Sequence, residues 1–207
     1  LLEYSGLEYE YSMSWDHFGD VWTNVKSKIP FQQLPMMETE DGTQICQSIA
    51  ILQYIENRSG LAINDPVKAA EAMAILQSSQ ELFAPLNPTI NFATGDDFIA
   101  KRDTMRGGLN NRFADLSRCL EKYEGKYFID DTPRAAEFAA FHHMDLSRHL
   151  DPDILNSFPR LVQFVKDIES IKTVSSYLEN RPELIDVGVE PKLIIDGRPQ
   201  PTGVQKT

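Results

Sequence analysis

The chain has 207 residues, enough for one domain of ordinary size or two small ones. Its 42% hydrophobic and 25% charged residues are close to the globular average, which excludes wholesale disorder and low-complexity character. The formal net charge of −11 repels phosphate backbones and anionic lipids. We therefore expect a small molecule or another protein as partner, with no nucleic acid and no membrane.

The two cysteines, Cys46 and Cys119, are too few for a disulfide framework and form no C-x-x-C pair. This predicts a reducing compartment, the cytoplasm, and no metal site. No apolar run approaches the roughly 20 residues of a membrane span. The opening residues 1–6 resemble the last turn of a helix followed by a glycine stop, so we expect further residues upstream.

Residues 1–62 mix strand and helix patterns. Apolar and polar residues alternate over residues 7–11, which predicts a half-buried strand. Residues 36–39 and 44–46 predict two strands joined by an Asp-Gly turn. An apolar helical pattern begins after Gln47 and ends near Gly60. The segment therefore predicts a small α/β unit.

Only helices are predicted from residue 65 to residue 183. Asp65 as N-cap and Pro66 at the first helical position begin the first of them, which we expect to reach about Leu86. The other predicted helices span residues 96–122, 133–150, a segment from residue 158, and 171–180. Residues 184–207, rich in proline and glycine, predict an irregular tail. The predicted fold class is α/β plus all-α.

Several motifs resemble those of the cytosolic glutathione transferases, most closely the sigma and mu classes. They are W-x-x-x-K at 22–26, P-F-Q-Q-L-P at 30–35, Q-S-I-A-I at 47–51, F-P-R-L at 158–161 and Y-L-E-N-R-P at 177–182. The resemblance covers residues 1–183. It implies a thioredoxin-like, glutathione-binding domain over residues 1–62 that lacks the family's first strand and most of its first helix. It also implies an α-helical bundle over residues 65–183.

The resemblance implies that Gln33, Leu34, Pro35, Gln47 and Ser48 bind glutathione. A cis Leu34–Pro35 bond would present the Leu34 backbone to the extended peptide; an ordinary trans turn is the alternative. Ser48 lies where a strand gives way to a helix, so its hydroxyl and the helix dipole can meet a carboxylate. The alternative is that Ser48 only caps the helix.

Trp22, Lys26 and Glu81 complete the implied glutathione site. Trp22 and Lys26 lie one helical turn apart, so an indole N–H and an ammonium can meet a second carboxylate. A core tryptophan beside a solvated lysine is the alternative. The family often takes an acid from the partner subunit for the glutathione ammonium, and the matching position is Glu81, or Gln80 one residue earlier. Glu81 could equally be a solvated helix charge.

The catalytic residue stays unknown, because the family's thiol-activating hydroxyl, a tyrosine in the sigma and mu classes, belongs to a strand expected upstream of Leu1. Tyr4, Tyr9 and Tyr11 match nothing in that motif. We therefore expect the 207 residues alone to fold poorly and to conjugate glutathione no faster than the solution reaction.

The implied function is conjugation of the glutathione thiolate to a small hydrophobic electrophile, or glutathione-dependent isomerisation, by a detoxifying homodimer. Glutathione is the co-substrate, with no other cofactor. The alternative is a non-catalytic protein of the same fold: crystallin-like, a ligand store or an interaction module.

Two features of the helix near residue 135 depart from simple patterns. The family's T-x-x-D capping box aligns with Arg134 to Glu137, but an arginine side chain cannot accept a hydrogen bond. The sequence therefore predicts a helix start at Thr132 or Pro133. Three histidines of this helix lack a metal-binding pattern and are interpreted as surface or packing residues: His142, His143 and His149.

Overall fold

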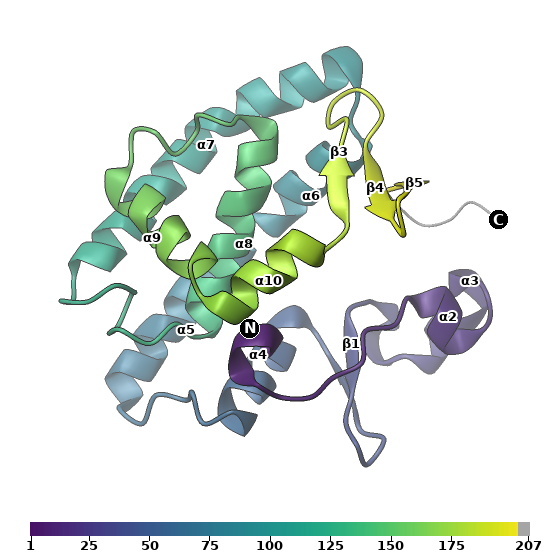
Figure 1. The fold of residues 1–207 in the computed structure, drawn as a ribbon, viewed down its shortest axis with the longest axis horizontal. Helices are drawn as coiled ribbons and strands as arrows, with labels where there is room; N and C mark the ends of the chain where they lie inside the picture. Colours follow the sequence, from purple (N-terminus) through teal and green to yellow (C-terminus); the bar gives the residue numbers. More distant parts are fainter. Residues whose placement is uncertain (203–207) are drawn as a thin grey trace. The chain divides into compact units, whose positions relative to one another are not determined.

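The structure, a computed structural model, describes residues 1–202 of the chain. Two compact units meet in the sequence between Ala62 and Ile63. Figure 1 shows short helices and a hairpin in the first unit, and longer helices with a small sheet in the second.

The first unit is a hairpin flanked by helices. Strands β1 (Met36–Glu38) and β2 (Gln44–Cys46) pair antiparallel, with Met36 opposite Cys46, which confirms the predicted hairpin around the Asp-Gly turn. Helix α4 (Ser48–Arg58) follows β2 directly and buries Ile55. The other elements of this unit are α1 (Leu2–Ser5), α2 (Ser14–Phe18), α3 (Trp22–Val25), η1 (Lys26–Lys28) and η2 (Pro30–Gln32).

The predicted strand over residues 7–11 is wrong. This stretch is neither helix nor strand, and Tyr9 and Tyr11 are exposed by 44% and 76%. The Tyr9 hydroxyl donates to the Glu3 carboxylate and that of Tyr11 to the Met13 sulfur. An alternating pattern yields a strand only where a neighbouring strand takes up its backbone groups, and β1 and β2 pair with each other instead.

The second unit is built around helix α8 (Ala135–Leu150), which packs against α5, α6 and α9. Twelve of its residues are buried, because alanines and phenylalanines occupy most positions around its first half. The surrounding helices are α5 (Pro66–Gln80), α6 (Phe83–Phe92), α7 (Gly95–Glu121), α9 (Pro159–Glu169) and α10 (Lys172–Asn180). Helix α7 runs without interruption through its two central glycines.

The first predicted helix of this unit starts as expected and then breaks. Asp65 caps α5, because its Oδ1 accepts from the backbone N–H groups of Val67 at 2.9 Å and Lys68 at 3.0 Å. The helix ends at Gln80 and α6 begins three residues later. Pro85 explains the break, since a proline ring collides with the carbonyl group four residues earlier.

The predicted start of α8 at Thr132 or Pro133 is also wrong. The helix begins at Ala135, and Arg134 is its extended N-cap residue. The backbone N–H of Arg134 donates to Oε2 of Glu137 at 2.8 Å, which is one half of a capping box. The arginine side chain supplies no acceptor, so the acid at the third helical position holds the start.

The prediction of an irregular tail over residues 184–207 is wrong for its described part. Strands β3 (Glu183–Ile185), β4 (Lys192–Ile195) and β5 (Arg198–Pro201) form an antiparallel sheet. The turn between β4 and β5 is Asp196-Gly197, with φ of 50° and 71°, as a tight hairpin turn requires. Residues 203–207 lie outside the described part.

Two contacts hold this sheet against the α6–α7 connection in the same unit. The Gly95 N–H donates to the Gly188 carbonyl at 2.8 Å, and the Thr202 hydroxyl donates to the Asn91 carbonyl at 2.5 Å. Gly188 has a φ of +82°, and a Cβ atom there would lie 2.5 Å from the Phe98 ring. The close approach therefore requires glycine.

Candidate functional site

Five of the residues predicted to bind glutathione lie at one end of the hairpin in the first unit. Residues 33–35 precede β1, and residues 47 and 48 follow β2. Because Met36 pairs with Cys46, the two segments leave the hairpin side by side. The Nε2 of Gln47 donates to Oε1 of Gln33 at 3.3 Å, so the structure brings these two predicted residues together.

The Leu34–Pro35 peptide bond is cis, which confirms the prediction. Gln33, Leu34 and Pro35 are all exposed. A ligand can therefore reach this edge of the unit.

Gln47 and Ser48 form the start of α4. Gln47 is the N-cap residue with a φ of +75°, an uncommon value for a residue other than glycine. Its side chain makes no capping hydrogen bond, and Ser48 is the first helical residue. The first backbone N–H groups of a helix lack intrahelical partners and carry the positive end of its dipole. This end of α4 is therefore suited to bind a carboxylate.

Trp22 and Lys26 lie at the two ends of the short helix α3. Trp22 is its first residue, and the backbone N–H of Lys26 donates to the Trp22 carbonyl. Between them, Val25 is buried with 2% exposure and anchors the helix, while Trp22 is half-buried and Lys26 exposed. The one-turn spacing is therefore as predicted, and Trp22 is not a fully buried core residue.

Glu81 lies in the second unit, directly after α5. Its Oε2 accepts from Nη2 of Arg112 at 2.8 Å, and Nη1 of Arg112 donates to the Ser78 hydroxyl at 2.5 Å. The Glu81 side chain is 65% exposed. It is thus accessible and already ion-paired within its own unit, an arrangement that the sequence did not reveal.

The strongest pKa shifts lie in the core of the helical unit. Burial raises the pKa of Glu137 to about 7 and lowers that of His143 to about 3. Both side chains are 1% exposed and belong to α8. The interpretation of His143 as a packing histidine agrees with this burial. No group of metal-binding side chains occurs within residues 1–202, and no helix of that part is long and apolar enough to cross a membrane.

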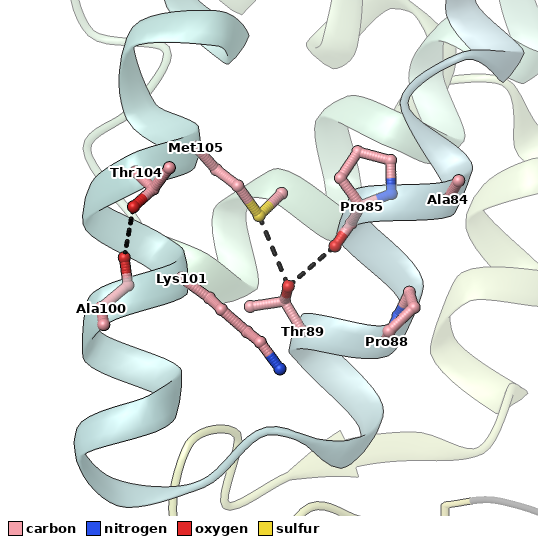
Figure 2. A pocket seen from close by; sticks show the side chains of 8 residues that line it. All are labelled: Ala84, Pro85, Pro88, Thr89, Ala100, Lys101, Thr104 and Met105. Carbon is pink, nitrogen blue, oxygen red and sulfur yellow. Dashed lines mark hydrogen bonds between the residues drawn. The ribbon is translucent and has the colours of Figure 1, made fainter.

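A pocket that sequence reasoning missed lies between α6 and α7 (Figure 2). It has a volume of about 410 Å³, and we call it the α6–α7 pocket. Small residues spaced four apart on both helices are the signal in the sequence. The residues that line it are Ala84, Pro85, Pro88, Thr89, Ala100, Lys101, Thr104 and Met105.

Comparison with known proteins identifies the family. The family model described as "Glutathione S-transferase, N-terminal domain" matches residues 1–57, and that of the C-terminal domain matches residues 90–181. The chain belongs to the glutathione S-transferase family. This glutathione transferase therefore has the predicted fold class, a thioredoxin-like N-terminal domain followed by a helical domain.

Individual relatives cover most of this glutathione transferase. Hematopoietic prostaglandin D synthase of Gallus gallus is 29% identical over 88% of each chain. Glutathione S-transferase Mu 1 of Macaca fascicularis is 28% identical over 87% of this chain and 83% of its own. The crystal structure of the Ascaris lumbricoides glutathione S-transferase shares the fold, with a TM-score of 0.72 and 22% identity over 88% of this chain and 89% of its own.

Proposed function

We propose that this glutathione transferase joins the thiol of glutathione to small hydrophobic electrophiles. The observation that carries the proposal is the match of both family domain models, in N-to-C order, to one chain. A relative named as a prostaglandin D synthase makes glutathione-dependent isomerisation the second candidate.

The proposed site matches the charges of glutathione, which has two carboxylates and one ammonium. We assign one carboxylate to Ser48 and the N-terminus of α4, next to the Gln47–Gln33 pair. The second carboxylate is assigned to Lys26 and the Trp22 indole, and the peptide backbone to Leu34 and Pro35. Glu81 of a partner subunit would hold the ammonium.

The proposed chemistry is nucleophilic substitution. The glutathione thiolate forms a carbon–sulfur bond to the electrophilic carbon, whose leaving group departs with its electron pair, and the thiol proton passes to solvent. A hydroxyl donor stabilises the thiolate, because the thiolate and not the thiol is the nucleophile. The proposal assigns this role to neither Tyr9 nor Tyr11, whose hydroxyls donate to Glu3 and Met13.

The remaining parts of the proposal concern the assembly and its surroundings. We propose a homodimer that uses glutathione as co-substrate without another cofactor, in the cytoplasm and in detoxification. The net charge of −11 argues against nucleic acid and anionic lipid as partners, and the absence of a C-x-x-C pair in the sequence supports a reducing compartment.

The test combines glutathione binding with turnover. In the full-length protein, isothermal titration gives the affinity for glutathione, and absorbance of the conjugate formed with chlorodinitrobenzene gives the rate above the solution reaction. Conjugation consumes one glutathione per product, whereas isomerisation regenerates it. The glutathione balance is therefore measured with chlorodinitrobenzene and with a cyclic lipid peroxide, and glutathione disulfide is measured as well, so that reduction of the peroxide is not counted as conjugation.

A matched pair of variants locates the site. Ser48→Ala should weaken glutathione binding, while Ser59→Ala makes the same change at the other end of α4 and should leave it unaltered. Binding without turnover of any electrophile would favour the non-catalytic alternative. No measurable binding of glutathione would refute the proposal.

A further inference from the structure

Arg112 of α7 divides its guanidinium between two residues at the end of α5. Its Nη2 donates to Oε2 of Glu81 at 2.8 Å, and its Nη1 donates to the Ser78 hydroxyl at 2.5 Å. A guanidinium frequently binds a carboxylate with two parallel hydrogen bonds, but here the second nitrogen has a different partner. The contact therefore occupies one carboxylate oxygen of Glu81, and the other, Oε1, accepts no hydrogen bond within residues 1–202.

Both sides of this contact rest on well-supported backbone. Arg112 lies inside the long helix α7, next to Phe113, whose ring is fully buried. The Glu81 backbone keeps helical torsions past the end of α5, and its N–H donates to the Gln77 carbonyl. The side chain of Arg112 is 30% exposed, whereas that of Glu81 is 65% exposed. A supported guanidinium thus holds a carboxylate that solvent and ligands can reach.

Holding an exposed glutamate in place matters for binding more than for folding. A glutamate side chain has several rotatable bonds, and a ligand that fixes it loses part of its binding free energy to the ordering. Arg112 orders the carboxylate before a ligand arrives. An exposed ion pair of this kind contributes little to the stability of the fold, so its removal leaves a folded protein in which binding can be measured.

We propose that Arg112 is a positioning residue for the glutathione ammonium. It holds the Glu81 carboxylate in place, and the free oxygen Oε1 accepts the hydrogen bond from the ammonium. The inference rests on the proposed function, in which Glu81 serves the site of a partner subunit, and it adds a residue that acts only through Glu81. The ammonium does not react, so the contact is equal in the ground state and the transition state and affects KM but not kcat.

Two ligands isolate the ammonium contact in the full-length protein. Glutathione is compared with glutaryl-cysteinyl-glycine, which lacks only the ammonium, by titration calorimetry. The wild type should bind glutathione more tightly than the analogue, roughly two- to fivefold, as an exposed ion pair allows. Arg112→Met should weaken glutathione by a similar factor and leave the analogue unchanged. With chlorodinitrobenzene as electrophile, the KM for glutathione should rise accordingly at an unchanged kcat.

Further variants show whether the effect passes through Glu81. Glu81→Gln should remove the preference for glutathione over the analogue, and Arg112→Met added to it should cause no further loss. Arg112→Lys keeps the charge but not the fork, so it should restore part of the affinity. Ser78→Ala removes only the second contact of the guanidinium and should give a smaller loss. Arg118→Met, which breaks an exposed ion pair elsewhere on α7, is the matched control and should change neither ligand.

Four results would overturn the proposal. They are an unchanged preference for glutathione in Arg112→Met, an equal loss of both ligands, a further loss in the double variant, and tighter glutathione binding, which would make Arg112 a competitor of the ammonium. A wild type that binds both ligands equally would exclude the ammonium contact and leave the transferase function intact. A wild type that does not bind glutathione would instead refute the proposed function itself.

Discussion

Replacement of His143 by leucine should stabilise the protein, and by more at pH 5 than at pH 7.5. The imidazole is 1% exposed, and neither ring nitrogen has a hydrogen-bond partner within residues 1–202. Burial, reinforced by neighbouring His142, lowers the pKa of His143 from 6.5 to about 3. The ring is therefore neutral in the folded protein throughout the physiological range.

The magnitude follows from the two states of this histidine. In the unfolded chain it binds a proton below pH 6.5, so the free energy of unfolding falls as the pH decreases from 6.5 toward 3. The slope is about 1.4 kcal/mol per pH unit, or about 2 kcal/mol between pH 6.5 and pH 5. Replacement by leucine also removes two buried unpaired polar atoms. This should raise the free energy of unfolding by about 1–3 kcal/mol at any pH.

Glu137 should impose the opposite slope. Burial raises its pKa from 4.5 to about 7, so the folded protein binds the extra proton in this range. Its contribution to the free energy of unfolding is then present below pH 4.5 and is lost as the pH rises to 7. Between pH 4.5 and pH 6.5 the opposite pH dependences that His143 and Glu137 give to the free energy of unfolding largely cancel. In His143→Leu only the pH dependence due to Glu137 remains.

Urea unfolding followed by circular dichroism at four pH values between 5 and 7.5 measures these slopes. The difference between His143→Leu and the wild type should grow by about 2 kcal/mol from pH 7.5 to pH 5. Glu137→Gln should leave a stability that rises with pH over the same range. A His143→Leu effect that is equal at both ends of the range would refute the buried neutral imidazole.

Three further predictions concern the site, the sheet and the assembly. Ser48→Ala should weaken glutathione binding roughly tenfold in titration calorimetry, as expected for one hydrogen bond to a carboxylate; an unchanged affinity would contradict the assignment. Gly188→Ala, whose Cβ would clash with Phe98, should reduce the hydrogen-exchange protection of β4, and full protection would show that the contact is dispensable. Sedimentation equilibrium should give the mass of two chains, and a monomer mass would count against the dimer.

Local signals predicted much of the fold, and the elements they missed depend on distant contacts. The Asp-Gly turn of the first hairpin and the Asp65 cap were predicted because the decisive residues are neighbours in sequence. The same dipeptide at Asp196-Gly197 was overlooked, since the apolar cluster of β4 is short. Its sheet is held by partners far away in the chain, such as the bond from Thr202 to the Asn91 carbonyl.

In the candidate site too, contacts between expected neighbours were predicted, whereas contacts between distant parts of the chain were not. Gln33 and Gln47 were expected together, and the hairpin register between them brings their side chains within 3.3 Å. The partner of Glu81 could not be inferred, because Arg112 lies 31 residues later on another helix. The α6–α7 pocket was also missed, since the spacing of small residues on each helix does not show how the two helices face each other.

The start of α8 was predicted wrongly because the prediction considered only the side chain of the N-cap residue. The capping box, which pairs the N-cap backbone with an acid at the third helical position, gives the observed start. Arg134 offers no acceptor to the helix, and its guanidinium donates instead to both carboxylate oxygens of Asp130, at 2.8 and 2.9 Å. Glu137 accepts from the backbone N–H groups of Arg134 and, at 3.0 Å, Phe128, so one buried acid satisfies two donors ahead of the helix. Its raised pKa reflects the cost of removing this carboxylate from water. In α8 the acid at the third helical position therefore holds the helix start, although the N-cap arginine offers no acceptor.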